Sequence, residues 1–139
     1  MNVTLSELMS SPVMSVAPGE TATHAAELMR SRRVSALPVV GPDGAAVGII
    51  TAVDLLDDRS DATQVEELMS QPALTVPASE GPHVAARIMR NHHVHHVVVV
   101  DHHRVVGMVS AYDLLALVEE HRYTAKQAPT PSARAPKRQ

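Results

Sequence analysis

The sequence has 139 residues, of which 45% are apolar and 19% charged, with a formal net charge of −3. This composition is typical of a globular protein and excludes disorder over the whole chain. The absence of cysteine excludes disulfides, cysteine-ligated zinc and thiol catalysis. No run approaches the ~18 apolar residues of a membrane helix. No basic residue occurs before Arg30 to begin a secretory signal, so we expect a cytoplasmic protein.

The distribution of charge and the aromatic content argue against a nucleic-acid binder. All 15 acidic residues precede residue 122, whereas residues 122–139 hold five basic residues and no acidic one. With no Phe or Trp and only two Tyr, the chain has no aromatic platform on which bases could stack. We therefore expect an acidic folded body with an aliphatic core, and a disordered, solubilising basic tail over residues 122–139.

An internal repeat is the strongest feature of the sequence. Glu7–Ser10 recurs as Glu67–Ser70 at an offset of 60, and Gly48–Asp54 corresponds to Gly107–Asp113 at an offset of 59. The lost residue falls in a turn, where loops tolerate deletions. Because the matches keep register over a whole unit, the pattern indicates a duplication.

Both repeats predict the same elements in the same order. In the first repeat we expect a short helix ending near Met9, an extended piece at 14–16, a helix over about 22–32 capped by Thr21, strands at 36–40 and 47–51 around a turn at 41–44, and a helix from Ala52. In the second we expect a short helix ending near Met69, an extended piece at 74–76, a helix from about Pro82, strands at 96–100 and 105–110, and a helix from Ala111.

This order of elements predicts the fold class. Continuous apolar strands flanked by helices indicate sheets covered by helices, an α/β or α+β layering. A unit of about 60 residues buries too little surface to be stable alone, so the two units should pack on one another around a pseudo-twofold axis. The expected domains are residues 1–60 and 61–121, followed by the tail at 122–139.

The motif Gly-x-x-Thr/Ser-x-x-Asp, at the junction of strand and helix, has two interpretations. Thr51 with Asp54, and Ser110 with Asp113, form the pattern of a helix capping box, which is the more frequent explanation. The same groups could bind a ligand, since a hydroxyl at a helix N-terminus suits phosphate and a carboxylate suits the hydroxyls of a ribose. The glycine that begins each motif would let another group approach the strand backbone.

Taken together, these motifs resemble those of a tandem pair of cystathionine β-synthase (CBS) domains, a Bateman module. The resemblance covers about Leu5 to Leu117 and rests on Leu-Met-Ser with a following Pro, the Ala-Ala-x-x-Met helix, Val-Ser-Ala-Leu-Pro-Val-Val at 34–40, and the Thr-x-x-Asp motif. It implies two β-α-β-β-α units around a cleft that holds an adenosine-containing ligand. The candidates are AMP, ADP and ATP, with NAD and S-adenosylmethionine as further possibilities, and no cofactor is required.

The resemblance also implies a role for each matching residue. The implied contacts are Asp54 and Asp113 to ribose hydroxyls, Thr51 and Ser110 to phosphate, Val53 and Tyr112 on the same turns, Ser35, Ala36, His95 and His96 along the phosphate, and Met14, Val16, Leu74 and Val76 along the adenine. It implies a homodimer and a regulated partner protein as well. The leading hypothesis is thus a stand-alone regulatory module, and the alternative is a scaffold that has lost its ligand.

Two other functions have weaker support in the sequence. Six histidines fall at 92, 93, 95, 96, 102 and 103, which raises a third hypothesis of a metal-binding protein. Adjacent histidines on a strand point to opposite faces, however, so we expect no metal site. No general base is placed beside a Ser or Thr nucleophile, and the chain has no P-loop, so we expect no enzyme activity.

Overall fold

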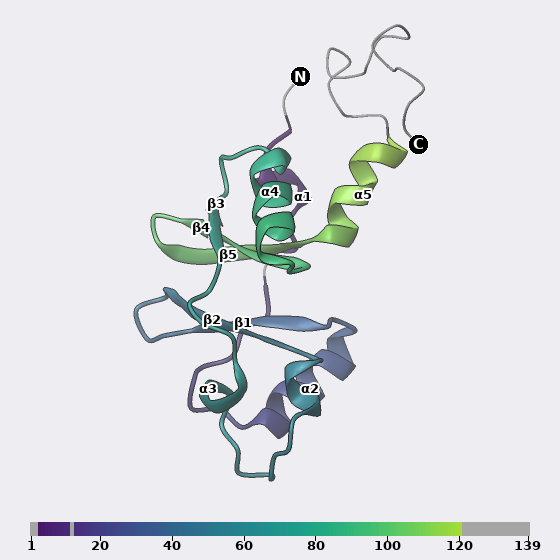
Figure 1. The fold of residues 1–139 in the computed structure, drawn as a ribbon. Coiled ribbons are helices and arrows are strands. Elements are labelled where there is room, and N and C mark those ends of the chain that lie inside the picture. The colour runs from purple at the N-terminus through teal and green to yellow at the C-terminus, as the bar shows by residue number, and fades with distance from the viewer. Residues whose placement is uncertain (1–2, 12, 121–139) are drawn as a thin grey trace, which may run out of the picture.

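The computed structural model describes residues 3–11 and 13–120, and the predicted tail lies outside these residues. The helices are α1 (Leu5–Leu8), α2 (Ala22–Arg32), α3 (Val65–Leu68), α4 (Pro82–His92) and α5 (Ala111–Glu119), with a 3₁₀ turn η1 (Asp54–Leu56). The strands are β1 (Ala36–Val40), β2 (Ala46–Thr51), β3 (Thr75–Pro77), β4 (His96–Asp101) and β5 (Arg104–Ser110). The expectation of mixed helix and sheet in two related halves is confirmed (Figure 1).

The strands form two small sheets, one in each half. Strands β1 and β2 pair antiparallel, and β4 pairs antiparallel with β5 and parallel with β3. The counterpart of β3 in the first half is reduced to one parallel bridge, Val16 to Val39. The two sheets lie against each other in the middle of the molecule, with helices on the outer side of each (Figure 1).

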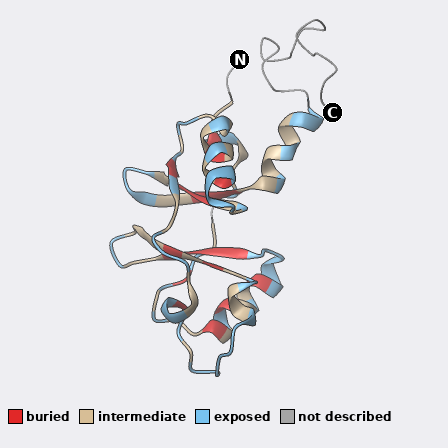
Figure 2. Cartoon of the chain, in the orientation of Figure 1, coloured by how far each residue is buried: buried red, intermediate tan, exposed pale blue. Residues whose placement is uncertain are grey.

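Three apolar clusters hold these layers together, and the buried residues form bands along them (Figure 2). Two clusters lie between a sheet and its helices, and a third joins the sheets through Ala36, Val98 and Met108. Each outer cluster combines valines of the strands with an alanine and a methionine of the long helix, Ala25 and Met29 in α2. The core is aliphatic, as the lack of Phe and Trp requires.

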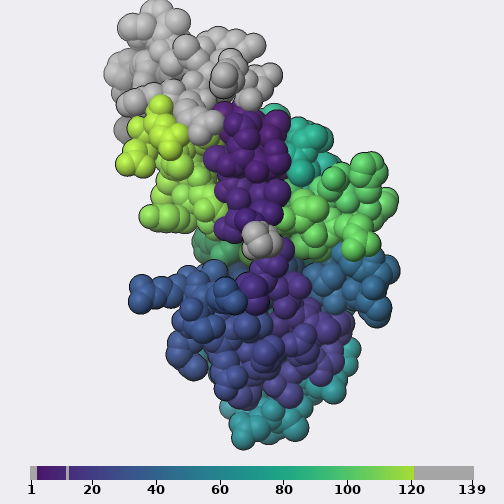
Figure 3. Space-filling model, turned by 180° about the vertical axis from the view of Figure 1, so that it is seen from behind, coloured from purple at the N-terminus to yellow at the C-terminus, as the bar shows by residue number. Residues whose placement is uncertain are grey.

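The short helix α1 packs on the second half of the molecule, away from its own repeat. Leu5 is fully buried in the cluster built from Val76, Val97 and Val109. The backbone N–H of Leu5 donates to the carbonyl of Glu80 at 2.9 Å, and the N–H of Ser10 donates to a carbonyl of β5 at 2.9 Å. Seen from behind, the purple N-terminal segment runs up over the green second half (Figure 3).

Helix α3 makes the reciprocal exchange. Val65 is fully buried in the core of the first half, and its N–H donates to the carbonyl of Glu20 at 2.8 Å. Ser70 and Ile49 exchange two backbone hydrogen bonds of 2.9 and 3.1 Å along β2. Each half is therefore completed by the short helix of the other repeat, so the units of the sequence and the units of the structure differ at their N-terminal ends.

The last helix differs between the repeats, and here one prediction was wrong. A helix from Ala52 was expected, but the first repeat forms only the three-residue turn η1, whereas α5 has nine residues. Asp57 follows η1 with its backbone extended, and the sequence continues with polar residues. In the second repeat Leu114 packs against the core and apolar residues continue to Val118, so burial of one helix face supports further turns.

Candidate functional site

A cleft of about 580 Å³ opens at the edge of the contact between the two sheets. It is lined by Ser10, Val13, Met14, Arg33, Val34, Ser35, Ala36, Leu37, His95, His96, Met108, Ser110, Ala111, Tyr112 and Asp113. We call it the larger cleft. Its volume lies within the range of about 300–1,000 Å³ that small-molecule sites occupy.

The pseudo-twofold axis relates this cleft to a smaller one of about 350 Å³. The smaller cleft is lined by Ser35, Ile49, Thr51, Ala52, Val53, Ser70, Pro72, Leu74, His93, Val94, His95 and His96. Most of these residues are the repeat counterparts of residues in the larger cleft: Ser70 corresponds to Ser10, Leu74 to Met14, and Thr51 to Ser110. The two clefts are thus versions of one site with different side chains.

Both clefts take residues from both repeats. In the larger cleft, Met14 and the residues that lead into β1 face the start of α5, which belongs to the second repeat. In the smaller cleft, Leu74 and the residues that lead into β4 face Thr51 and Val53 of the first repeat. Each candidate site therefore exists only when the two repeats are packed together.

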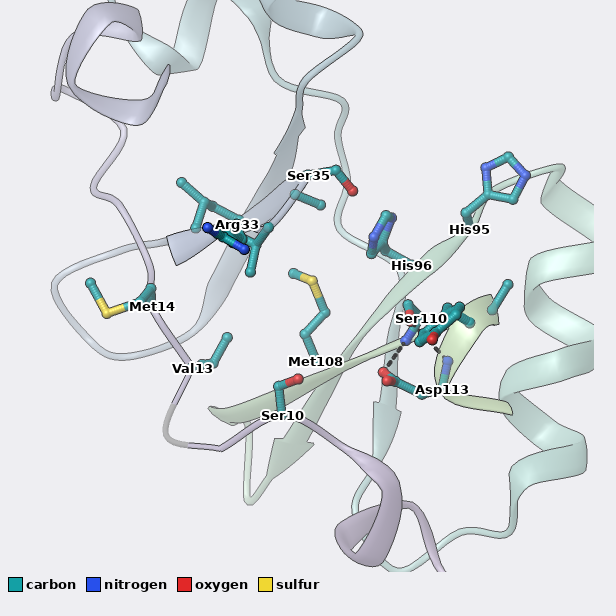
Figure 4. A pocket seen from close by; sticks show the side chains of 15 residues that line it. Ser10, Val13, Met14, Arg33, Ser35, His95, His96, Met108, Ser110 and Asp113 are labelled. Carbon is teal, nitrogen blue, oxygen red and sulfur yellow. Dashed lines mark hydrogen bonds between the residues drawn. The ribbon is translucent and has the colours of Figure 1, made fainter. Parts of the chain in front are cut away.

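Ser110 and Asp113 fix the start of α5 at one wall of the larger cleft (Figure 4). The Ser110 hydroxyl accepts from the Asp113 N–H at 3.0 Å, and Asp113 Oδ2 accepts from the Ser110 N–H at 2.8 Å. The capping-box interpretation is therefore confirmed. No hydrogen bond within the described part of the chain involves Asp113 Oδ1, so this oxygen can still accept from a ligand.

Thr51 and Asp54 repeat this geometry in the first half. Asp54 Oδ2 accepts from the Thr51 N–H at 2.8 Å, and the Thr51 hydroxyl accepts from the Asp54 N–H at 3.2 Å. The element that follows is the short turn η1, whose peptide dipoles are too few to add up as they do in α5. Thr51 lines the smaller cleft and Asp54 stands behind it, outside the lining.

The basic side chains of the larger cleft lie across from Asp113 (Figure 4). Arg33 ends α2 with a left-handed backbone conformation, φ 56°, which turns the chain toward β1. His95 and His96 come from the start of β4. Burial lowers the pKa of His96 below its ordinary value of 6.5, the neighbouring His95 lowers this pKa further, and the charge of Asp113 raises it. His96 is therefore a neutral imidazole at pH 7.

The domain model of one family matches each repeat in turn. The model described as the CBS domain covers residues 5–61 and again residues 65–120. The chain belongs to the CBS domain family. The resemblance expected from the sequence is confirmed, and the molecule is a CBS domain pair.

Known relatives agree with this assignment. Hypoxic response protein 1 of Mycobacterium tuberculosis is 31% identical over 125 residues, which cover 85% of this chain and 87% of that protein. Homoserine O-acetyltransferase of Methanosalsum zhilinae is 28% identical over 125 residues. This match covers 88% of the CBS pair but only 25% of that enzyme, so the chain spans about a quarter of the enzyme's length.

Two solved CBS pairs have closely similar folds. The CBS domain pair of protein MJ0100, in complex with 5′-methylthioadenosine and S-adenosyl-L-methionine, has a TM-score of 0.80 and 26% identity, and the match covers 87% of this chain and 99% of that one. Hypoxic Response Protein I with two coordinated zinc ions has a TM-score of 0.75 and 28% identity, covering 82% and 98%. Within residues 3–11 and 13–120 of the present CBS pair, no three His, Asp or Glu side chains gather as a metal-binding group.

Most of the residues that the sequence singled out line one of the two clefts. Met14, Ser35, Ala36, His95, His96, Ser110, Tyr112 and Asp113 line the larger cleft, and Ser35, Thr51, Val53, Leu74, His95 and His96 line the smaller one. Arg33, Val13 and Met108 are lining residues that sequence reasoning missed. The signal for Arg33 was its place directly before the Val-Ser-Ala motif, at the position where the second repeat has His93.

Val16 and Val76, which the resemblance placed along the adenine, line neither cleft. Their side chains are 2% and 0% exposed and belong to the cores of the two CBS units. Val16 also uses its backbone groups for the bridge to β1, and Val76 lies within β3. The neighbouring Met14 and Leu74 point into the clefts, because side chains alternate along an extended segment.

The glycines of the repeated motif have the role expected of them. Gly48 and Gly107 admit another group to the strand backbone, but that group is the chain itself. A Cβ atom on Gly107 would lie 2.5 Å from Met9 Sδ and 2.8 Å from the Ser10 carbonyl oxygen. These glycines therefore allow the exchange of segments between the CBS units.

Proposed function

We propose that this CBS pair is a regulatory module that binds an adenosine-containing nucleotide in the larger cleft. The observation that carries the proposal is the combination, in one cleft, of an unused carboxylate oxygen on Asp113, the N-terminus of a nine-residue helix and the cationic side chain of Arg33. These groups complement ribose hydroxyls and phosphate. The CBS pair of MJ0100, 26% identical, holds two adenosine-containing ligands, which supports this ligand class.

Each part of such a ligand has a matching wall. The ribose hydroxyls donate to Asp113 Oδ1, and the phosphate lies toward the start of α5, with Arg33 and His95 across from it. The adenine lies along the apolar side chains of Val13, Met14 and Met108. The same features are reduced around Thr51, where the cleft is smaller and η1 replaces the helix, so we place the nucleotide in the larger cleft.

The regulatory output follows from the position of the cleft between the repeats. A ligand that touches both CBS units stabilises their packed arrangement by mass action. It can change a partner protein only if that partner has different affinities for the empty and the filled arrangement. We propose that the partner is a separate protein and that the pair itself is not catalytic.

A ligand panel tests the proposed function. Thermal unfolding of the full chain is followed by circular dichroism with AMP, ADP, ATP, NAD, S-adenosylmethionine and Zn²⁺ in turn. A rise of Tm with at least one adenosine compound, growing with its concentration, supports the module. No rise with any of them supports the scaffold, and a rise with Zn²⁺ alone supports a metal-binding protein.

Replacing Asp113 by Asn separates the ligand role of this residue from its capping role. The amide oxygen can still accept from the Ser110 N–H, but the negative charge that favours the ribose is gone. A hydrogen bond to a charged group contributes about 1.5–3 kcal/mol, so we expect the affinity for the best nucleotide of the panel to fall by ~10-fold or more in Asp113→Asn. Isothermal titration calorimetry measures it.

Asp54→Asn is the matched control. It removes a charge from the same hydrogen-bond pattern in the other repeat, at a residue outside both cleft linings. The nucleotide affinity of Asp54→Asn should stay within about twofold of that of the parent chain, because residue 54 does not line the proposed site. Equal losses in the two variants would show that Asp113 acts through helix stability alone, and would contradict the proposed site.

We propose further that the pair forms a homodimer through α5. Tyr112, Leu115 and Val118 recur every third residue on this helix and are 81%, 59% and 62% exposed. An apolar stripe of this kind on a surface helix is typical of a protein interface. Multi-angle light scattering should give twice the monomer mass for the full chain and the monomer mass for Leu115→Glu. A monomeric parent chain would contradict the proposal.

A further inference from the structure

The two clefts share one wall. Ser35, His95 and His96 line the larger cleft, and the same three residues line the smaller one. They lead into β1 and β4, which the pseudo-twofold axis brings together where the sheets meet. The partition between the two candidate sites is therefore a single layer of side chains.

This wall is asymmetric. His96 stands where the first repeat has Ala36, and His95 stands where it has Ser35. Both imidazoles thus come from the second repeat, and the first repeat adds no charge to the partition. Ala36 is 5% exposed in the cluster that joins the sheets, and His96 lies half-buried at the corresponding place.

The charged and titratable groups around His96 come from both sides. His95 lies beside it on the same strand, Arg33 and Asp113 face it in the larger cleft together with Tyr112, and His93 lines the smaller cleft. Burial and His95 both oppose protonation of His96, and only Asp113 favours it. An anion in either cleft would add to the effect of Asp113 and would draw a proton onto the ring.

We propose that the shared wall couples the two clefts, so that a phosphorylated ligand in the larger cleft weakens the binding of a second phosphorylated ligand in the smaller one. The inference rests on the proposed function, because it takes the larger cleft as the nucleotide site. One proton on His96 balances one negative charge, whereas two phosphate groups on opposite sides of the wall bring several. They also repel one another across the shared wall, and the repulsion between like charges grows as the distance between them falls.

The coupling depends on charge and therefore on pH. At pH 8 the imidazole of His96 is neutral, and the repulsion between the two ligands is not compensated. At pH 6 a proton that the bound phosphates draw onto His96 supplies positive charge to the wall and reduces the repulsion. Two uncharged ligands, such as two adenosine molecules, do not repel one another in this way at either pH.

The experiment is calorimetric titration of the full chain with AMP and with adenosine at pH 8.0 and pH 6.0. With AMP at pH 8.0 we expect one tight site and a second at least ~10-fold weaker, a gap of the size usual for coupled sites. The difference in affinity between the two sites should be smaller at pH 6.0. With adenosine this difference should be smaller than with AMP at both pH values.

His95→Arg tests the wall directly. His95 is exposed and lines both clefts, so a guanidinium at this position supplies a charge at every pH with little effect on packing. The second AMP should then bind within about threefold of the first at pH 8.0. His92→Arg, a matched change at an exposed residue that lines neither cleft, should leave the gap of the parent chain unchanged.

The outcomes distinguish the two proposals. Four results would each overturn the coupling and leave the proposed function intact. AMP could bind two sites with equal affinity at pH 8.0, or it could bind a single site under every condition. The difference in affinity between the two sites could also be as large with adenosine as with AMP, or His95→Arg could leave that difference unchanged. Failure of every adenosine compound to bind would overturn the proposed function, and the coupling with it.

Discussion

Leu5→Ala should lower the free energy of unfolding by about 2–5 kcal/mol, the range for a fully buried Leu whose removal leaves a cavity. Leu5 is 0% exposed, and the buried residues around it, among them Val76, Val97 and Val109, all belong to the second repeat. The change should therefore weaken the second half of the molecule, although residue 5 opens the first repeat. Urea unfolding followed by far-ultraviolet circular dichroism measures the loss.

Hydrogen exchange locates the damage. In Leu5→Ala the amides of β4 and β5 should exchange faster, and those of β1 and β2 should change less. Leu56→Ala is the control, because this leucine is 82% exposed and its loss should cost under ~0.5 kcal/mol. If Leu5→Ala also costs less than this, or if faster exchange is confined to β1 and β2, α1 does not complete the second half.

The second large effect is expected from Gly107→Ala. The new methyl group would lie 2.5 Å from Met9 Sδ and 2.8 Å from the Ser10 carbonyl oxygen. The sulfur belongs to a flexible side chain and can move, but the carbonyl belongs to the backbone pairing between Ser10 and β5. Overpacking of this kind costs about 1–3 kcal/mol, so thermal unfolding should show a clearly lower Tm.

Gly19→Ala is the matched control for Gly107→Ala. A Cβ atom on Gly19 meets nothing within 4 Å, so this change should be neutral or slightly stabilising. The double change Met9→Ala with Gly107→Ala should recover part of the loss by removing one of the two contacts. A Gly107→Ala chain as stable as the parent would mean that the exchanged segment can shift away from β5 at no cost.

The exchange of segments also builds the clefts. The segment that follows α1 supplies Ser10, Val13 and Met14 to the larger cleft, and the segment that follows α3 supplies Ser70 and Leu74 to the smaller one. Stability and ligand binding thus depend on the same crossing of the chain.

The local structure of this protein could be predicted from its sequence. The strand at 36–40 and the helix from Pro82 were located correctly, because β-branched runs, proline at a first helical turn and the Thr21 cap act over a few neighbouring residues. The capping box at Ser110 is local for the same reason, since its two hydrogen bonds join residues three apart. The repeat extended each of these predictions to a second copy.

Two features of the site were decided by the tertiary structure alone. The sequence places Asp113 and Met14 in different repeats, 99 positions apart, and no local pattern shows that they line one cleft. Likewise, the repeat shows where α1 begins but not which half buries Leu5. A short apolar helix can bury its side chains against either of two similar surfaces. Which surface it takes depends on the packing of both halves together, and therefore on residues far from the helix in the sequence.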